Sequence, residues 1–187
     1  MTGPHPLAWS HHGALQQMFQ KLYVHNYRCL QNFELRLGSQ PSVLLLGKNG
    51  SGKSTVRDAL QILQSVARGT NRVGALVQAK DFYRKRTDEP MRIVADVVLQ
   101  DQHYRYELAL EYPPGFKELR VLEESLECEG QHIFSRQSAQ VNLSEAEGVG
   151  FRIDWHVVAL PLIQARSTHE PLALFRTWLA RSLILAP

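Results

Sequence analysis

The sequence has few cysteines, no long apolar run and little excess charge. Cys29 and Cys128 are its only cysteines, too few for a disulfide framework and without the paired spacing of a zinc site. Its longest apolar runs, such as residues 43–46 and 157–160, are far shorter than a membrane span. Lysine plus arginine total 21 against 18 acidic residues, and this net charge of +3 does not argue for nucleic acid by itself. We therefore expect a cytoplasmic protein with no membrane partner.

What remains is the composition of one globular domain, with 187 residues of which 44% are hydrophobic and 21% charged. Residues 1–17 carry prolines and histidines but lack the apolar centre of a signal peptide. We interpret them as a disordered extension or as a start codon placed too early. The eight histidines show no metal-ligand spacing. Regular patterning begins at Met18, so residues 18–187 are expected to form the folded unit.

Apolar periodicity predicts an α/β fold. Residues 18–26 and 33–37 are expected to be strands, and residues 42–46 a strand that is buried on both faces. Residues 53–68 have the spacing of an amphipathic helix, and Gly69 is a natural stop.

Beyond Gly69 the apolar period changes to two, which predicts an antiparallel β-rich arm. The expected elements are a short helix near 76–82, a hairpin of 93–99 with 104–110, a hairpin of 119–128 with 131–136, a loop over 141–150, a strand at 151–155 and a final helix opened by 168–171. Tyr104 and Tyr106 share a strand face and are expected in the core, and Ser167 and Thr168 are expected to cap the final helix.

One motif carries chemistry: residues 47–54, Gly-Lys-Asn-Gly-Ser-Gly-Lys-Ser, fit the P-loop (Walker A) pattern between an expected strand and an expected helix. Glycines let successive amides point into one concavity, and the helix start adds positive potential there. Lys53 is expected to reach the β- and γ-phosphates, and the Ser54 hydroxyl to bind Mg²⁺. The residues expected to bind the phosphates of ATP are Gly47, Asn49, Gly50, Ser51, Gly52, Lys53, Ser54 and Thr55.

Two P-loop classes do not fit. A small GTPase needs an Asn-Lys-x-Asp motif, which the sequence lacks, and a nucleotide kinase needs alternating helices and parallel strands rather than two hairpins. Residues 19–30, Phe-Gln-Lys-Leu-Tyr-Val-His-Asn-Tyr-Arg-Cys-Leu, together with residues 44–55, resemble the start of ABC-class ATP-binding proteins. These include structural-maintenance-of-chromosomes and recombination-repair ATPases, and the AAA-family ATPases of overcoming-lysogenization-defect nucleases. The resemblance extends over residues 18–187 and is sharpest in residues 19–60.

This resemblance implies the N-terminal lobe of an ABC-type P-loop ATPase, which hydrolyses ATP as a homodimer and acts with DNA or an attached nuclease. It would place Asn26, Tyr27 and Arg28 near the nucleotide, with Arg28 either a phosphate contact or a solvated turn residue.

Several family parts are missing from the sequence. The nearest Walker B acids are Asp96 and Glu124, but both fall in period-two hairpins, where we expect them to face solvent. Residues 143–146, Leu-Ser-Glu-Ala, lack the glycines of a signature loop, and the Q-loop glutamine that would bind Mg²⁺ is either Gln164 or Gln78. The second lobe is therefore expected to lie outside this chain. The sequence predicts Mg-ATP binding and leaves hydrolysis open, the alternative being a truncated, non-catalytic nucleotide-binding or interaction fragment.

Overall fold

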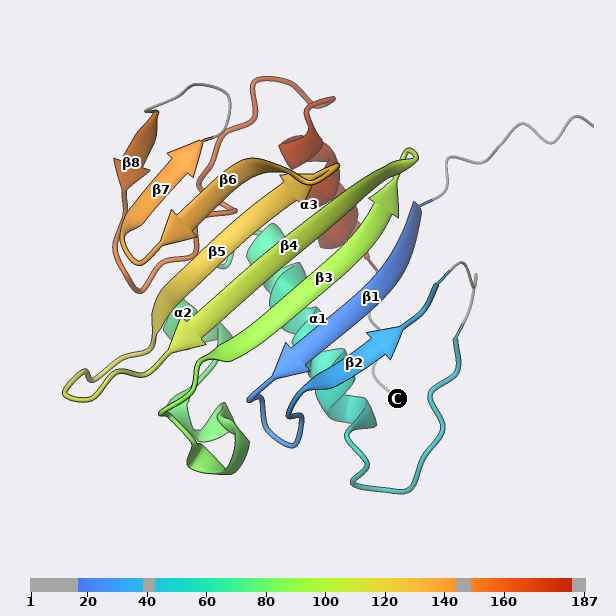
Figure 1. Cartoon of the computed structure of the whole chain (residues 1–187), viewed down its shortest axis with the longest axis vertical. Helices are drawn as coiled ribbons and strands as arrows, with labels where there is room; N and C mark the ends of the chain where they lie inside the picture. Colours follow the sequence, from blue (N-terminus) through green and yellow to red (C-terminus); the bar gives the residue numbers. More distant parts are fainter. Residues whose placement is uncertain (1–16, 39–42, 144–148, 183–187) are drawn as a thin grey trace, which may run out of the picture.

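The computed structural model describes residues 17–38, 43–143 and 149–182. Within these residues it consists of one eight-stranded sheet with helices on one face (Figure 1). Neighbouring strands are antiparallel throughout, in the order β2-β1-β3-β4-β5-β6-β7-β8. The strands are β1 (Gln17–His25), β2 (Phe33–Arg36), β3 (Met91–Leu99), β4 (Gln102–Glu111), β5 (Arg120–Cys128), β6 (Gln131–Gln137), β7 (Gln140–Leu143) and β8 (Gly150–Arg152).

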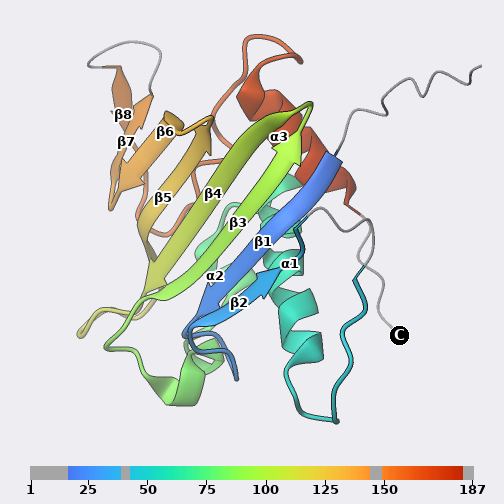
Figure 2. The same cartoon turned by 45° about the vertical axis from the view of Figure 1, so that its right-hand side comes forward.

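Three helices accompany the sheet: α1 (Lys53–Ala67), α2 (Val73–Leu76) and α3 (Pro171–Arg181). Two short 3₁₀ helices, η1 (Ala79–Asp81) and η2 (Tyr83–Lys85), follow α2. Figure 2 shows α1 and α3 on the same side of the sheet. No helix among the described residues is long and apolar enough to cross a membrane.

The core lies between the sheet and the two longer helices. Phe175 of α3 packs against Tyr104 and Tyr106 of β4, with ring centroids 6.0 and 5.7 Å away, and all three side chains are buried. Burial of a large apolar side chain contributes roughly 1.5–3 kcal/mol, so these rings tie α3 to the middle of the sheet. The expected core role of Tyr104 and Tyr106 is confirmed.

Helix α1 also forms as its periodicity predicts. Val56, Ala59 and Leu63 are buried on its inner face, and Gly69 follows the helix with φ +108°, in the region that favours glycine. The two central hairpins, β3–β4 and β5–β6, are confirmed as well.

The buried strand predicted for residues 42–46 is wrong. Residues 43–46 have no secondary structure, and Leu44 and Leu46 are 78% and 83% exposed, while Ser42 lies outside the described residues. A strand forms only beside a partner, and no described strand of the sheet pairs with residues 43–46. Apolar composition alone could not supply that partner.

Three smaller expectations are also corrected. The predicted loop over 141–150 contains the end of β7 and the start of β8, which pair with each other. Ser167 and Thr168 do not cap α3, because its N-cap is Glu170 and Pro171 opens the first turn. The short helix expected near 76–82 is split between α2, which ends at Leu76, and η1.

Candidate functional site

The glycine-rich loop, residues 47–52, ends at the N-terminus of α1. Gly50 and Gly52 have φ +81° and +94°, a backbone conformation that other residues rarely adopt. Gly52 is the N-cap, and its carbonyl accepts the first helical hydrogen bond, from the amide of Val56 at 3.0 Å. The first turn of α1 has no acidic residue and no side-chain cap. The helix therefore presents its free amides and positive end without a neutralising carboxylate, which suits an anion.

Lys53 closes the glycine-rich loop from the other side. Its ammonium donates hydrogen bonds to the carbonyl oxygens of Gly47 at 2.7 Å and Lys48 at 2.9 Å. The Ser51 hydroxyl lies 3.3 Å from the same nitrogen. The positive charge is thus held across the loop, beside the amides of the helix start.

The turn after β1 packs directly against this loop. A Cβ atom at Gly52 would lie 3.2 Å from Leu30 Cδ2 and 3.3 Å from Cys29 Sγ, so only glycine fits without displacement. The Cys29 thiol also lies 3.3 Å from the hydroxyl of Thr55, which is buried. Ser54, one position earlier, is exposed. Sequence reasoning missed Cys29 as a neighbour of the loop, and only its position after Arg28 could have suggested it.

Arg28 joins this turn to α1 and η1 through two ion pairs. Its guanidinium pairs with Asp58 and lies 3.0 Å from Asp81, and its amide donates to the Asp81 carbonyl at 2.6 Å. The guanidinium also lies over the ring of Tyr27, 5.2 Å from the centroid. Burial alone would lower the pKa of Arg28, but the bond to Asp81 and the nearby acids raise it overall. The structure therefore gives this arginine two carboxylate partners, which the sequence did not reveal.

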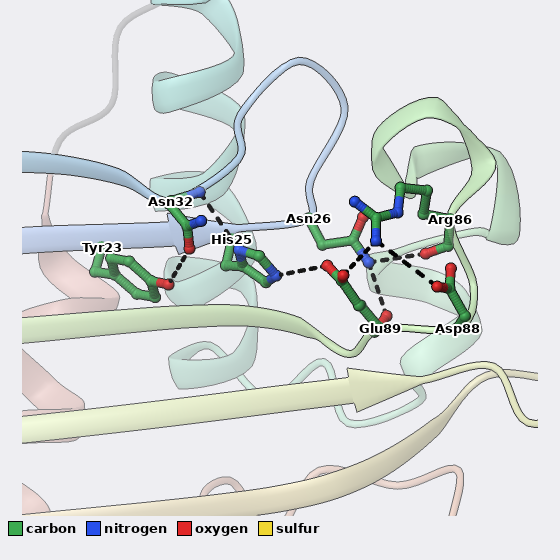
Figure 3. Close-up of polar contacts among 7 residues, drawn as sticks. All are labelled: Tyr23, His25, Asn26, Asn32, Arg86, Asp88 and Glu89. Carbon is green, nitrogen blue, oxygen red and sulfur yellow. Dashed lines mark hydrogen bonds and ion pairs between the residues drawn. The ribbon is translucent and has the colours of Figure 1, made fainter.

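Asn26 and Tyr27, the other expected nucleotide contacts, are buried. The Asn26 amide donates to the carbonyl oxygens of Arg86 at 2.8 Å and Glu89 at 2.7 Å (Figure 3). Its carboxamide oxygen is buried and has no hydrogen-bond partner in the part of the chain that the structure describes. Burial raises the pKa of Tyr27 to about 12. Asn26 thus holds the turn against the segment that follows η2, and Tyr27 pairs with Phe82, which precedes η2.

A polar network extends from this turn along β1 (Figure 3). His25 Nε2 lies 3.3 Å from a carboxylate oxygen of Glu89, which also pairs with Arg86. The other ring nitrogen of His25 accepts from the amide of Asn32, whose side chain accepts from the hydroxyl of Tyr23 at 2.9 Å. The end of β1 is thereby fixed to the residues that lead into β3.

The two candidate Walker B acids lie in different surroundings. Asp96 is half-buried and pairs with Lys21 and Arg105, each at 3.0 Å. Glu124 is fully buried, so its expected exposure is wrong. Its carboxylate accepts from the amides of Ala159 and Leu160, at 2.6 and 2.8 Å. Both acids are therefore engaged with residues outside the glycine-rich loop.

The two candidate Q-loop glutamines lie apart from each other. Gln164 lines a hollow of about 510 Å³ with Glu129, His132 and Leu172, and no residue of the glycine-rich loop contributes to it. Gln78 is the N-cap of η1, where its backbone N–H donates to the side-chain carboxylate of Asp81. Among the described residues, no group of three or more histidines, cysteines or acids could hold a metal ion.

Comparisons with known proteins place these features in a family. The profile of the family described as an AAA ATPase domain matches residues 18–143, more than half of the chain. A solved structure of the recombination mediator protein RecF with ATPrS, from the RecFOR pathway, is similar with a TM-score of 0.38 and 15% identity. That similarity covers 62% of this chain and 28% of the RecF chain, and no curated protein matches. By its match over residues 18–143, the chain belongs to the AAA ATPase domain family.

Proposed function

We propose that this chain binds ATP together with Mg²⁺ at the glycine-rich loop, as the N-terminal part of an ATPase. The observation that carries the proposal is the Lys53 ammonium, held across a loop whose amides open the uncapped start of α1. An amide cradle with one fixed cation complements a polyphosphate. Membership of an ATPase family supports ATP as the ligand.

The residues present fit a nucleotide with its metal. Positions 50 and 52 have positive φ angles, which favour glycine, and glycine has no side chain that would fill the cradle. Lys53 would bind the β- and γ-phosphates, and the exposed Ser54 hydroxyl would supply one oxygen to Mg²⁺. Nucleotide phosphates and water are the usual further ligands of Mg²⁺ at a phosphate-binding loop, and Gln164 stays a candidate ligand. Mg²⁺, when bound, would neutralise phosphate charge.

Asn26, Tyr27 and Arg28 have a supporting role in this proposal. Arg28 would contact a phosphate only by leaving Asp58 or Asp81, while Asn26 and Tyr27 act by holding the turn. Cys29 and Leu30 of the same turn pack against Gly52 and so hold the glycine-rich loop in place.

Turnover needs an acid that positions water, and the engagement of Asp96 and Glu124 favours binding without hydrolysis by this chain alone. In a complete protein, a second lobe would supply that acid. Two copies of the protein would then form a homodimer through bound nucleotide, with DNA or a nuclease as partner. The second candidate, a non-catalytic nucleotide-binding fragment, rests on the same two occupied acids.

The test is titration of a fluorescent ATP analogue with Mg²⁺ into wild type, Lys53→Ala and the control Lys117→Ala, an exposed lysine of the β4–β5 turn. Loss of a charge-assisted contact should weaken binding about 10- to 100-fold in Lys53→Ala and leave Lys117→Ala unchanged. Equal affinity of the three proteins would refute the site. Phosphate release above the Lys53→Ala background would instead show that this chain carries a complete catalytic centre.

A further inference from the structure

Three cations without an acidic partner lie on the segment between α2 and β3. Lys80 belongs to η1, and Arg84 and Lys85 belong to η2. All three side chains are exposed, and none forms an ion pair with another residue in the described part of the chain. Arg84 lies over the ring of Tyr83, 5.1 Å from its centroid, and this contact does not neutralise its charge. We call residues 80–85 the basic loop.

The acidic residues of the same stretch are already paired. Asp81 lies 3.0 Å from the guanidinium of Arg28, and Glu89 pairs with Arg86. Asp88 lies 3.7 Å from Arg86 as well (Figure 3). The two acids that follow the basic run in the sequence therefore neutralise Arg86, and the three cations of the basic loop keep their full charge.

The basic loop is held in a backbone conformation that its residues rarely adopt. Arg84 and Lys85 have φ +47° and +59°, and such residues persist only where the surrounding contacts fix them. Here the side chain of the buried Asn26 donates to the carbonyl oxygen of Arg86 at 2.8 Å. The backbone carbonyl of Asn26 accepts from the amide of Tyr83 at 3.2 Å. Because these two anchors flank the strained pair, the loop presents its cations from a fixed backbone.

The surroundings of the basic loop favour one kind of anionic partner. Figures 1 and 2 both show the segment, in green before β3, beyond the end of the sheet. No large apolar side chain of residues 71–90 is exposed. Protein interfaces have an apolar centre, whereas a phosphate backbone binds to cations alone. Tyr83 is half-buried and covered by Arg84, so the loop offers no free ring on which an unpaired base could stack. These features fit the backbone of a double helix.

We propose that the basic loop binds the phosphate backbone of double-stranded nucleic acid, with Lys80, Arg84 and Lys85 as the phosphate contacts. Such contacts position a duplex without reading its base sequence. The proposal rests on the proposed function in that it gives the nucleic-acid partner a surface. The contact itself needs no bound nucleotide, so the two can be tested apart.

The test is fluorescence anisotropy with a short fluorescein-labelled DNA duplex, titrated with protein over a series of salt concentrations. In the variant Lys80→Ala, Arg84→Ala and Lys85→Ala, affinity should fall at least about tenfold. Each phosphate contact adds about 0.9 to the slope of log affinity against log salt concentration, so the slope should flatten by about 2.7. A duplex of unrelated sequence should give the same result, because phosphate contacts do not distinguish bases.

Two control variants separate the position of the charges from their number. The matched control removes three exposed cations that also lack an ion pair among the described residues and that lie on the β4–β5 turn, β8 and α3: Lys117→Ala, Arg152→Ala and Arg181→Ala. It should bind the duplex as wild type does. The second control keeps the charge of the basic loop and should keep the salt slope of wild type: Lys80→Arg, Arg84→Lys and Lys85→Arg.

Three results would overturn the proposal. The first is wild-type affinity in the alanine variant of the basic loop. The second is an equal loss in the matched control, which would show an effect of net charge alone. The third is displacement of the labelled duplex by poly-glutamate as readily as by unlabelled duplex of equal charge, which would assign the loop to an acidic protein.

Nucleotide binding is measured on the same proteins, so that failure of this proposal is distinguishable from failure of the nucleotide site. The alanine variant of the basic loop should keep the wild-type affinity for the ATP analogue, and Lys53→Ala should keep the wild-type affinity for the duplex. If Lys53→Ala loses the duplex while the loop variant keeps it, the nucleic-acid contact lies at the glycine-rich loop, and the proposal is wrong. Equal ATP affinity of wild type and Lys53→Ala would refute the nucleotide site and leave the duplex result standing.

Discussion

Replacing Glu124 tests the energetics of the buried cluster that joins the sheet to the segment before α3. Its Oε1 accepts from the Leu160 amide at 2.8 Å and from the Tyr106 hydroxyl at 2.9 Å, and its Oε2 accepts from the Ala159 amide at 2.6 Å. Arg136, whose side chain is also fully buried, lies 3.8 Å from Oε2. The carboxylate therefore accepts hydrogen bonds from β4 and from residues 159–160, and it lies beside the buried charge of β6.

Two substitutions separate the contributions of this carboxylate. Glu124→Gln keeps one carbonyl oxygen for Leu160 and Tyr106 but turns an amide toward the N–H of Ala159. One buried donor loses its partner, so we expect a loss of about 1–3 kcal/mol in the free energy of unfolding. Glu124→Ala removes every acceptor and leaves Arg136 without its counter-charge, for which we expect about 3–5 kcal/mol.

The neighbouring residue offers a matched control. Glu123 is 42% exposed on the opposite face and pairs with Arg92 at 2.9 Å, so Glu123→Gln should cost no more than about 1 kcal/mol. Urea unfolding followed by circular dichroism gives all three values, and melting temperatures should fall by roughly 2–4 °C per kcal/mol at this size. If Glu124→Gln is as stable as wild type, or no less stable than Glu123→Gln, the assigned role of the buried carboxylate is wrong.

Three further predictions concern the metal, the loop and pH. In the same fluorescence titration, Ser54→Ala should weaken ATP binding when Mg²⁺ is present but much less when the metal is chelated, because the Ser54 hydroxyl would bind the ion rather than the phosphates. An equal loss of affinity in both conditions would show that the metal binds elsewhere. Gly52→Ala and Gly130→Ala both place alanine at positive φ and should each cost about 1–2 kcal/mol in urea unfolding, but only Gly52→Ala, which crowds Cys29, should also lower ATP affinity. Burial raises the pKa of Glu124 despite its hydrogen bonds, so the native state holds this proton more tightly than the unfolded chain. Its contribution to stability should be complete below about pH 4 and fall as pH rises through the raised pKa, and Glu124→Gln should lack that slope in urea unfolding measured across pH.

Local periodicity predicted the parts of the fold whose partners are close in sequence. Helix α1 needs only its own spacing of buried residues, and β3–β4 and β5–β6 are hairpins with short turns. The glycine-rich loop could also be found, because its residue types are fixed by the backbone conformation at Gly50 and Gly52. The match of an AAA ATPase domain over residues 18–143 confirms the family resemblance, while the ABC-type lobe stays a prediction.

The burial of Glu124 could not be predicted, because a bulge changes which residues of β5 face the core. Val121 pairs with Leu110, but the next partner, Ala109, pairs with Glu123, so one extra residue lies in β5 at this point. Strict alternation from Val121 would have placed Glu124 in solvent. The bulge instead puts it on the inner face, with Leu126. Such a shift depends on pairing across strands, and in the sequence it shows only as a change from odd to even apolar positions between Val121 and Leu126.

The failure over residues 43–46 has a different origin. These residues are apolar, as the prediction assumed, but their burial requires a packing partner, and the local sequence does not show whether one is present. Arg28 is a similar case, since Asp58 and Asp81 reach it from segments distant in sequence. Short-range patterns therefore predicted elements and the loop, while long-range charge pairing had to come from the structure.

The order of the strands has a consequence for how the chain folds. β1 pairs with β3, so the glycine-rich loop and α1 lie inside a long closed loop, residues 26–90, whereas β3 to β6 pair through short turns. Closing a long loop has a larger entropic cost than closing a hairpin, and long-range pairing slows folding. The β3–β6 meander can thus form first, as a platform to which β1 later adds. The loop at the start of α1 would acquire its native geometry only in that late step, so a ligand that binds there would act on the final stage of folding and not on the meander.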